Sequence, residues 1–185
     1  MREFRQPSET FGPYDPGSQK VKPDTSTPAR RAAVEVEDAI RSDTLETGAF
    51  IAPDGQVLLQ RQGQSDRVKY RESELILMRG SLFTHNHPSG SGFSVEDVVL
   101  ASAFGFAELR AVTFDFRHVA YGIPEHEGAQ WKDAYALAES EAASELIEKV
   151  RLGELHPKDF GQEVRHRAWG KVAKSFNFFY AREKS

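Results

Sequence analysis

Two histidines one residue apart are the first feature of this sequence that could do chemistry. His85 and His87 come at the end of a short apolar stretch, 81–85, that predicts a strand. Side chains alternate along an extended chain, so both imidazoles point the same way and can face one metal ion. Asp97, in the first turn of the next predicted helix, could add an oxygen ligand. Two histidines, one carboxylate and a water form an open, catalytic type of zinc site, because a closed structural site has a fourth protein ligand.

A hydrolytic zinc site also needs a base that is not bound to the metal. Glu46 is the best candidate if the strand predicted to follow it, 47–52, is the neighbour of 81–85. A carboxylate there could take a proton from a water whose pKa zinc lowers to about 7, and pass it to the leaving amine. Ser94 could donate a hydrogen bond to the oxyanion of the transition state. Four other glutamates are also near in the sequence: Glu35, Glu37, Glu72 and Glu74.

Each of these residues also has a purely structural interpretation. His85 and His87 could be surface-loop histidines, and Glu46 could be an ordinary carboxylate at a strand edge. Ser94 and Asp97 match a capping box, in which each residue bonds the backbone N–H of the other at a helix start. The capping and chemical roles are compatible.

The remaining histidines are expected to be solvated or to cap helices. His118 is expected in a hairpin turn, His126 in an acidic loop, His156 before a proline, and His166 on the final helix.

The candidate residues occur in an order that resembles the JAB/MPN metalloprotease family, also called JAMM. The pattern is Glu46, then His85-Asn86-His87-Pro88, then Ser94-Val95-Glu96-Asp97, and the resemblance covers about residues 42–123. The run from His85 to Gly90 is also similar to the RadC branch and to JAB-like domains of phage head proteins and polymorphic toxins. Six residues, 88–93, separate His87 from Ser94, where the family usually has one more.

The resemblance implies a role for each matching residue. His85, His87 and Asp97 would bind zinc, Glu46 would be the general base, and Ser94 would stabilise the oxyanion.

The elements expected to position these residues are helices and strands in mixed order. Amphipathic spacing predicts helices at 32–41, 72–80, 94–104, 129–152 and 160–180. Alternation and turn signals predict strands at 47–52, 56–60, 81–85, 109–116 and 118–123. The sequence therefore predicts an α/β (α+β) fold: a mixed sheet flanked by helices, resembling the JAB/MPN fold, plus two C-terminal helices.

Composition predicts three parts. Residues 1–31 form a proline-rich linker or extended arm, 32–125 a JAB/MPN-like metal-site domain, and 126–185 a helical extension packed on it. The polar segments 61–71 and 124–130 are expected to form the walls of the cleft.

Charge and residue usage exclude several classes of protein. Lys and Arg number 24 against 28 Asp and Glu, a net charge of −4, which excludes a histone-like composition. There are no cysteines, so disulfide scaffolds and cysteine-ligated metals are excluded. The apolar runs are too short for a membrane span. The start lacks the apolar core of a standard signal peptide, so we expect cytoplasmic synthesis, with or without specialised export.

The function predicted from these observations is zinc-dependent hydrolysis of peptide or isopeptide bonds in a protein or peptide substrate. A bacterial toxin, effector or phage-associated domain is the expected context, with a larger toxin or phage polypeptide or a cognate inhibitor as partner. The alternatives are a metal-dependent nuclease and a catalytically silent JAB-like binding or structural module. Residues 160–185 hold six Lys or Arg against two Glu, which would suit nucleic acid but fits a solvated helix face better.

Overall fold

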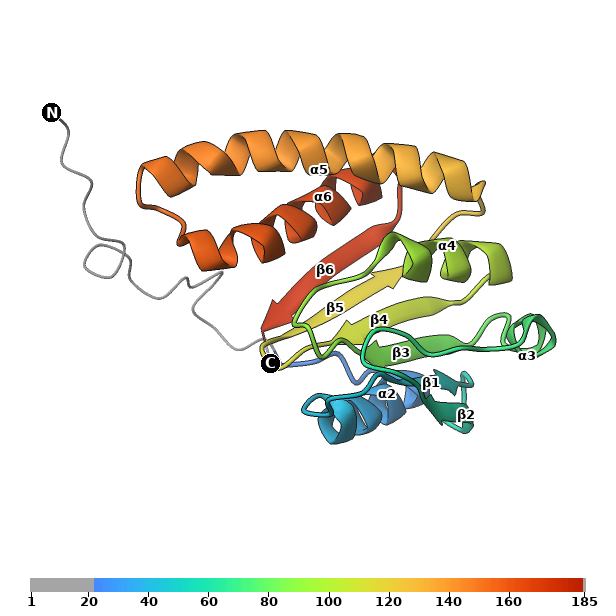
Figure 1. Ribbon diagram of the computed structural model, residues 1–185. Helices are drawn as coiled ribbons and strands as arrows, with labels where there is room; N and C mark the ends of the chain where they lie inside the picture. The colour runs from blue at the N-terminus through green and yellow to red at the C-terminus, as the bar shows by residue number, and fades with distance from the viewer. Residues whose placement is uncertain (1–21, 185) are drawn as a thin grey trace, which may run out of the picture.

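The computed structural model describes residues 22–184, in which six strands form one mixed sheet with helices on both faces (Figure 1). The elements in chain order are α2 (Pro28–Ile40), β1 (Thr47–Ile51), β2 (Val57–Gln62), α3 (Glu72–Leu77), β3 (Leu82–Asn86), α4 (Val95–Phe104), β4 (Glu108–Val112), β5 (Phe116–Tyr121), α5 (Gly128–Arg151), the short 3-10 helix η1 (Pro157–Asp159), α6 (Phe160–Phe176) and β6 (Phe179–Lys184). This mixed sheet flanked by helices confirms the predicted fold class. The linker was predicted over residues 1–31, and its residues 1–21 lie outside the described part of the chain.

The strand order is β2-β1-β3-β4-β5-β6. Strands β3 and β4 are parallel, and every other neighbouring pair is antiparallel. Two parallel strands need a crossover connection, and α4 provides it between β3 and β4. The segment after β3 must therefore reverse direction before this helix begins. Gly48 of β1 pairs with His85 of β3, which meets the condition set for Glu46 as a neighbour of the histidines.

Alternation along the strands divides the apolar residues between two faces. Strand residues such as Phe50, Phe83 and Leu109 share the largest core cluster with residues of α4, α5 and α6. A smaller cluster joins α2 to Ile51 and Leu82 on the opposite face. In Figure 1, α5 and α6 lie side by side above the sheet, and α2 lies apart from them near β1.

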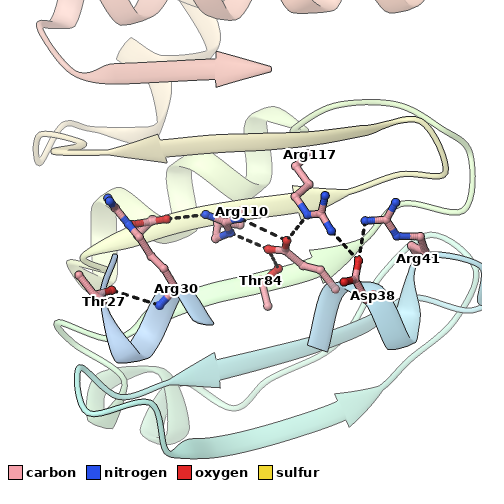
Figure 2. A network of polar contacts seen from close by, with 9 residues as sticks. Thr27, Arg30, Asp38, Arg41, Thr84, Arg110 and Arg117 are labelled. Carbon is pink, nitrogen blue, oxygen red and sulfur yellow. Dashed lines mark hydrogen bonds and ion pairs between the residues drawn. The ribbon is translucent and has the colours of Figure 1, made fainter. Parts of the chain in front are cut away.

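Buried ion pairs attach α2 to its face of the sheet (Figure 2). The Glu37 carboxylate accepts hydrogen bonds from Arg110 Nε at 2.6 Å, Arg117 Nε at 2.9 Å and Thr84 Oγ1 at 3.0 Å. Arg110 also donates to Glu108, whose second oxygen accepts from Arg30 Nε at 2.8 Å. Glu37 is fully buried, and each of its oxygens has a guanidinium partner. This arrangement satisfies the rule that a buried charge must be paired and hydrogen-bonded.

The first helix begins earlier than predicted. It begins at Pro28 rather than at residue 32, and Thr27 Oγ1 accepts a hydrogen bond from the Arg30 backbone N–H. Proline suits the first helical position because its fixed φ is helical and its missing N–H has no partner there in any helix. Helix α3 ends at Leu77, short of the predicted residue 80.

The prediction for the fourth and fifth strands placed the turn too late. The chain turns at 113–115, where the Thr113 N–H donates to the Phe116 carbonyl and Thr113 Oγ1 accepts from the Phe116 N–H. His118 therefore lies inside β5 and is buried, and the prediction that it sits in a turn is wrong.

The end of the chain also differs from the prediction. Helix α6 ends at Phe176, because Asn177 takes a left-handed conformation with φ of 55°. Strand β6 follows and pairs antiparallel with β5 along its whole length. The helix predicted to continue to residue 180 is therefore replaced at its end by a sixth strand of the sheet. Among residues 22–184, no helix combines the length and apolarity needed to cross a bilayer.

Candidate metal centre

Strand β3 and helix α4 bring the three predicted metal ligands together. The Nε2 atoms of His85 and His87 are 2.8 Å apart. Asp97 lies 3.4 Å from His85 Nε2 through Oδ1 and 3.5 Å from His87 Nε2 through Oδ2. One ligand atom from each residue lies within 4.8 Å of the others, a separation that a single metal ion could bridge. The histidines are almost completely buried, so the surface-loop interpretation is wrong.

The capping interpretation of Ser94 and Asp97 is confirmed, and it positions the candidate ligand. Ser94 Oγ accepts a hydrogen bond from the Asp97 N–H at 3.2 Å, and Asp97 Oδ2 accepts one from the Ser94 N–H at 2.7 Å. The capping bonds fix the carboxylate at the helix start, where both of its oxygens face the imidazoles. The two roles coexist in one residue.

Glu46 lies beside this group. Its Oε1 is 3.7 Å from His87 Nε2, and the backbone around it is fixed by hydrogen bonds with Gln64 and Gly63. Burial raises the pKa of Glu46, the nearby charge of Asp97 raises it further, and His85 opposes both. A raised pKa brings a carboxylate closer to the neutral range in which it can accept and return a proton.

The electrostatics favour metal-competent protonation states for His87 and Asp97, whereas Asp97 favours the protonated form of His85. Burial lowers the pKa of His87 to about 4, with the neighbouring His85 adding to the effect. For Asp97, burial alone would raise the pKa, but His85 and His87 hold it well below its usual range. Burial would lower the pKa of His85, yet Asp97 raises it. Asp97 therefore attracts a proton to His85, and the same field attracts a cation.

Hydrogen bonds at its other ring nitrogen orient His87. Its Nδ1 lies 2.9 Å from the Ser91 carbonyl oxygen and 3.0 Å from that of Gly92. An Nδ1–H that donates to these carbonyls leaves Nε2 unprotonated and free to coordinate.

Asn86 is a positioning residue that sequence reasoning missed. Its buried side chain points to the face opposite the two histidines. There its Oδ1 accepts from the Thr47 N–H at 2.7 Å, and its Nδ2 donates to the carbonyls of Asp43 and Leu45. One amide thus ties the segment that carries Glu46 to the strand that carries the histidines. The signal was present, because a polar side chain between two inward-facing residues of a buried strand must find partners.

A cavity of about 580 Å³ opens beside these residues. Its lining includes Glu46, His85, His87, Ser94 and Asp97. Residues 65–68 and Tyr70 form another wall, as expected for the segment 61–71. The segment 124–130 does not line this cavity, so that part of the prediction is wrong.

Three of the other histidines lie in the segments predicted for them, although His166 is partly buried rather than solvated, and none of the four belongs to the metal-type group. His156 caps η1 by accepting from the Lys158 N–H, and His126 lies in the loop before α5. His166 lies on α6, with Nδ1 at 3.1 Å from Tyr180 Oη.

Much of the basic charge in the last segment is paired. Lys171 contacts Glu141 and Glu145 of α5 at 3.1 and 2.8 Å, and Arg182 contacts Glu163 at 2.8 Å. These pairs favour the interpretation of a helix face that packs against acidic neighbours over a nucleic-acid contact.

Comparison with protein-family models, with curated proteins and with solved structures finds no match for this chain. The function of this chain must therefore be inferred from the chemistry of the site itself.

Proposed function

We propose that this chain is a zinc-dependent hydrolase of peptide or isopeptide bonds. The observation that carries the proposal is the convergence of His85, His87 and Asp97 beside Glu46 in the lining of one cavity. Tetrahedral zinc with bonds of 2.0–2.1 Å places its ligand atoms about 3.3 Å apart. The two Nε2 atoms are 2.8 Å apart, and each lies 3.4 or 3.5 Å from a different Asp97 oxygen, so the donor set fits a single ion in residue type and in approximate spacing.

A bound zinc ion would supply Lewis-acid chemistry and lower the pKa of a water molecule to about 7. Glu46 is the residue placed to take a proton from that water and deliver it to the leaving amine. Its carboxylate reaches the same imidazole as Asp97 but lies farther from it, at 3.7 Å, and it directly precedes β1, whereas Asp97 belongs to α4. Burial keeps this carboxylate ready to hold a proton, because it penalises the charged form.

Ser94 is the residue placed to stabilise negative charge on the substrate carbonyl. Its Oγ accepts from the Asp97 N–H, so its own O–H remains available as a donor. Ser94 lines the cavity together with Glu46, so both residues can reach a substrate held there.

The first experiment measures zinc in the purified protein by elemental analysis. We expect about one zinc per chain in the wild type and none in His85→Ala/His87→Ala, since an open site has three protein ligands. His156→Ala is the matched control, because it removes a histidine that caps η1 and should keep its zinc. A wild type without zinc, even after reconstitution, would leave the silent binding module as the better account.

The second experiment measures hydrolysis with panels of fluorogenic peptides and isopeptide-linked conjugates. Glu46→Gln should keep zinc and lose activity by about 10²-fold or more, because it removes the proton acceptor but keeps the shape. Ser94→Ala should lose less. Magnesium-dependent nicking of DNA by the same preparation, with no peptide cleavage, would instead support the nuclease.

A further inference from the structure

The segment between His87 and α4, residues 88–93, is held from outside by the C-terminal part of the chain. We call this segment the metal loop. Trp169 of α6 donates from Nε1 to the Phe93 carbonyl oxygen at 2.9 Å, and Gln162 of the same helix donates from Nε2 to the Gly90 carbonyl oxygen at 3.2 Å. Two residues on α6, about two helical turns apart, therefore bond two backbone carbonyls of the metal loop.

A third contact supports the metal loop at Gly92. A Cβ atom at this position would lie 2.8 Å from His118 Cε1, so only glycine lets the backbone approach the ring this closely. His118 Nδ1 lies 3.1 Å from Tyr180 Oη of β6, and the same oxygen lies 3.1 Å from His166 Nδ1 of α6. Strand β6 and helix α6 therefore fix the ring on which Gly92 rests.

The metal loop passes this constraint to a candidate ligand. The carbonyls of Ser91 and Gly92 lie 2.9 and 3.0 Å from His87 Nδ1, and both belong to the stretch between the two α6 contacts. A shift of the metal loop would rotate these acceptors away from the imidazole. The direction in which His87 Nε2 points depends on that bond.

We infer that α6 and β6 are the outer support of the metal centre, and that Trp169 is a positioning residue that acts through the metal loop on His87. The inference rests on the metal site of the proposed function but not on the reaction catalysed there. Groups that orient a metal ligand through its second nitrogen typically change metal affinity by about 10–100-fold when removed.

The chain offers a matched control for Trp169. Trp131 is also fully buried and belongs to the same core cluster. Within residues 22–184, its Nε1 has no hydrogen-bond partner, whereas that of Trp169 reaches the metal loop. Replacing either indole by phenylalanine removes a similar volume from the same core, but only one replacement removes a bond to the loop.

The experiment compares the zinc dissociation constants of the wild type, Trp169→Phe and Trp131→Phe by competition with a chromogenic chelator. We expect about tenfold weaker binding for Trp169→Phe and a change within about twofold for Trp131→Phe. Thermal unfolding without zinc measures what each loss of volume does to the fold. Equal zinc affinities in the two variants would overturn the inference and leave the metal site intact.

A second variant keeps the test decisive if Trp169→Phe does not fold. Gln162→Met removes the donor to Gly90 at a partly exposed position and preserves side-chain length. We expect about threefold to tenfold weaker zinc binding, and an unchanged affinity would overturn the inference. A wild type that binds no zinc would overturn both proposals. Zinc binding without any hydrolysis would overturn only the proposed function.

Discussion

The two faces of the sheet both bury charged groups, and they balance them in opposite ways. On the α2 face, Glu37 and Glu108 meet the guanidinium groups of Arg110, Arg117 and Arg30. On the α4 face, Asp97 and Glu46 approach each other around two imidazoles, and the ion pairs they make within residues 22–184 are with those imidazoles alone. Neighbouring residues of one strand supply both arrangements, since Thr84 bonds Glu37 and His85 faces Asp97.

The difference separates a structural set of charges from a candidate site. Permanent cations of the chain neutralise the carboxylates on the α2 face, so that network has no need of a ligand. The α4 face has converging lone pairs and negative charge, but its cationic partners are groups that can lose their proton. Buried acids arranged in this way favour an added cation.

The largest expected effect tests the network of ion pairs around Glu37 on the α2 face. Glu37→Gln leaves Arg110 and Arg117 buried without their shared counter-charge, so we expect a loss of about 3–5 kcal/mol in the free energy of unfolding. Urea unfolding measures this loss. A loss under about 1 kcal/mol would show that the arginines do not depend on Glu37 for neutralisation, since breaking a buried pair normally costs more.

The next effect tests the residue that links the two faces. Asn86→Leu leaves the Thr47 N–H and two carbonyls without their partner, so we expect a loss of about 2 kcal/mol in the free energy of unfolding. We also expect reduced hydrolysis, because Glu46 lies in the segment that this substitution releases. Thr84→Val is the control on the same face. It removes one bond to Glu37, and should cost about 1 kcal/mol with hydrolysis unchanged. Equal activity in both variants would argue against the positioning role of Asn86.

A smaller effect is the pH dependence of stability that His166 causes, since this residue belongs to the support of the metal loop. Burial, reinforced by Arg182, lowers the pKa of His166 to about 4. The unfolded chain binds this proton near the usual value of 6.5, so stability should fall as pH drops from about 6.5 towards 4. Allowing for the partial exposure of the ring, we expect the free energy of unfolding to fall by about 1 kcal/mol between pH 6.5 and 5. The dependence of this free energy on pH should be weaker in His166→Gln. Urea unfolding at both pH values measures the slopes, and identical slopes would contradict the assignment.

The smallest expected effect gives the sharpest contrast. Glu46→Gln makes the same chemical change as Glu37→Gln, but the pKa of Glu46 is raised by burial, so its charged form costs stability at neutral pH. We expect the free energy of unfolding to stay constant or rise by up to about 1 kcal/mol. Parallel urea titrations of the two variants measure the contrast. A large destabilisation by Glu46→Gln would make the two faces equivalent and remove the basis for the comparison.

Local patterns were sufficient to predict the candidate site. The His-x-His spacing depends only on the alternation of a strand, and Ser94 and Asp97 mark a helix start, so sequence reasoning could single out all three candidate ligands. The ion network could not be predicted, because Glu37 meets Arg110 and Arg117 across 73 and 80 residues of sequence. Such a pairing depends on strand order, which no local pattern encodes.

The errors in the predicted elements also arise because pairing between distant strands is not visible in local sequence patterns. Phe176 and Tyr180 continue the four-residue spacing of α6, so periodicity predicts a helix up to residue 180 and misses β6. Pairing with the edge of β5 decides the structure of that segment instead. The stretch from Val112 to Phe116 is rich in residues that favour strands, which hides the turn at 113–115.

Because β3 pairs with β1 on one side and with β4 on the other, its register is fixed twice. A one-residue insertion or deletion within it would turn every later side chain to the opposite face. The histidines would then lie under α2 among arginines, and Asn86 would lie in the cavity. Length changes along the chain are therefore far from equivalent, because the five residues of β3 must keep their number for the histidines to stay on the face of α4.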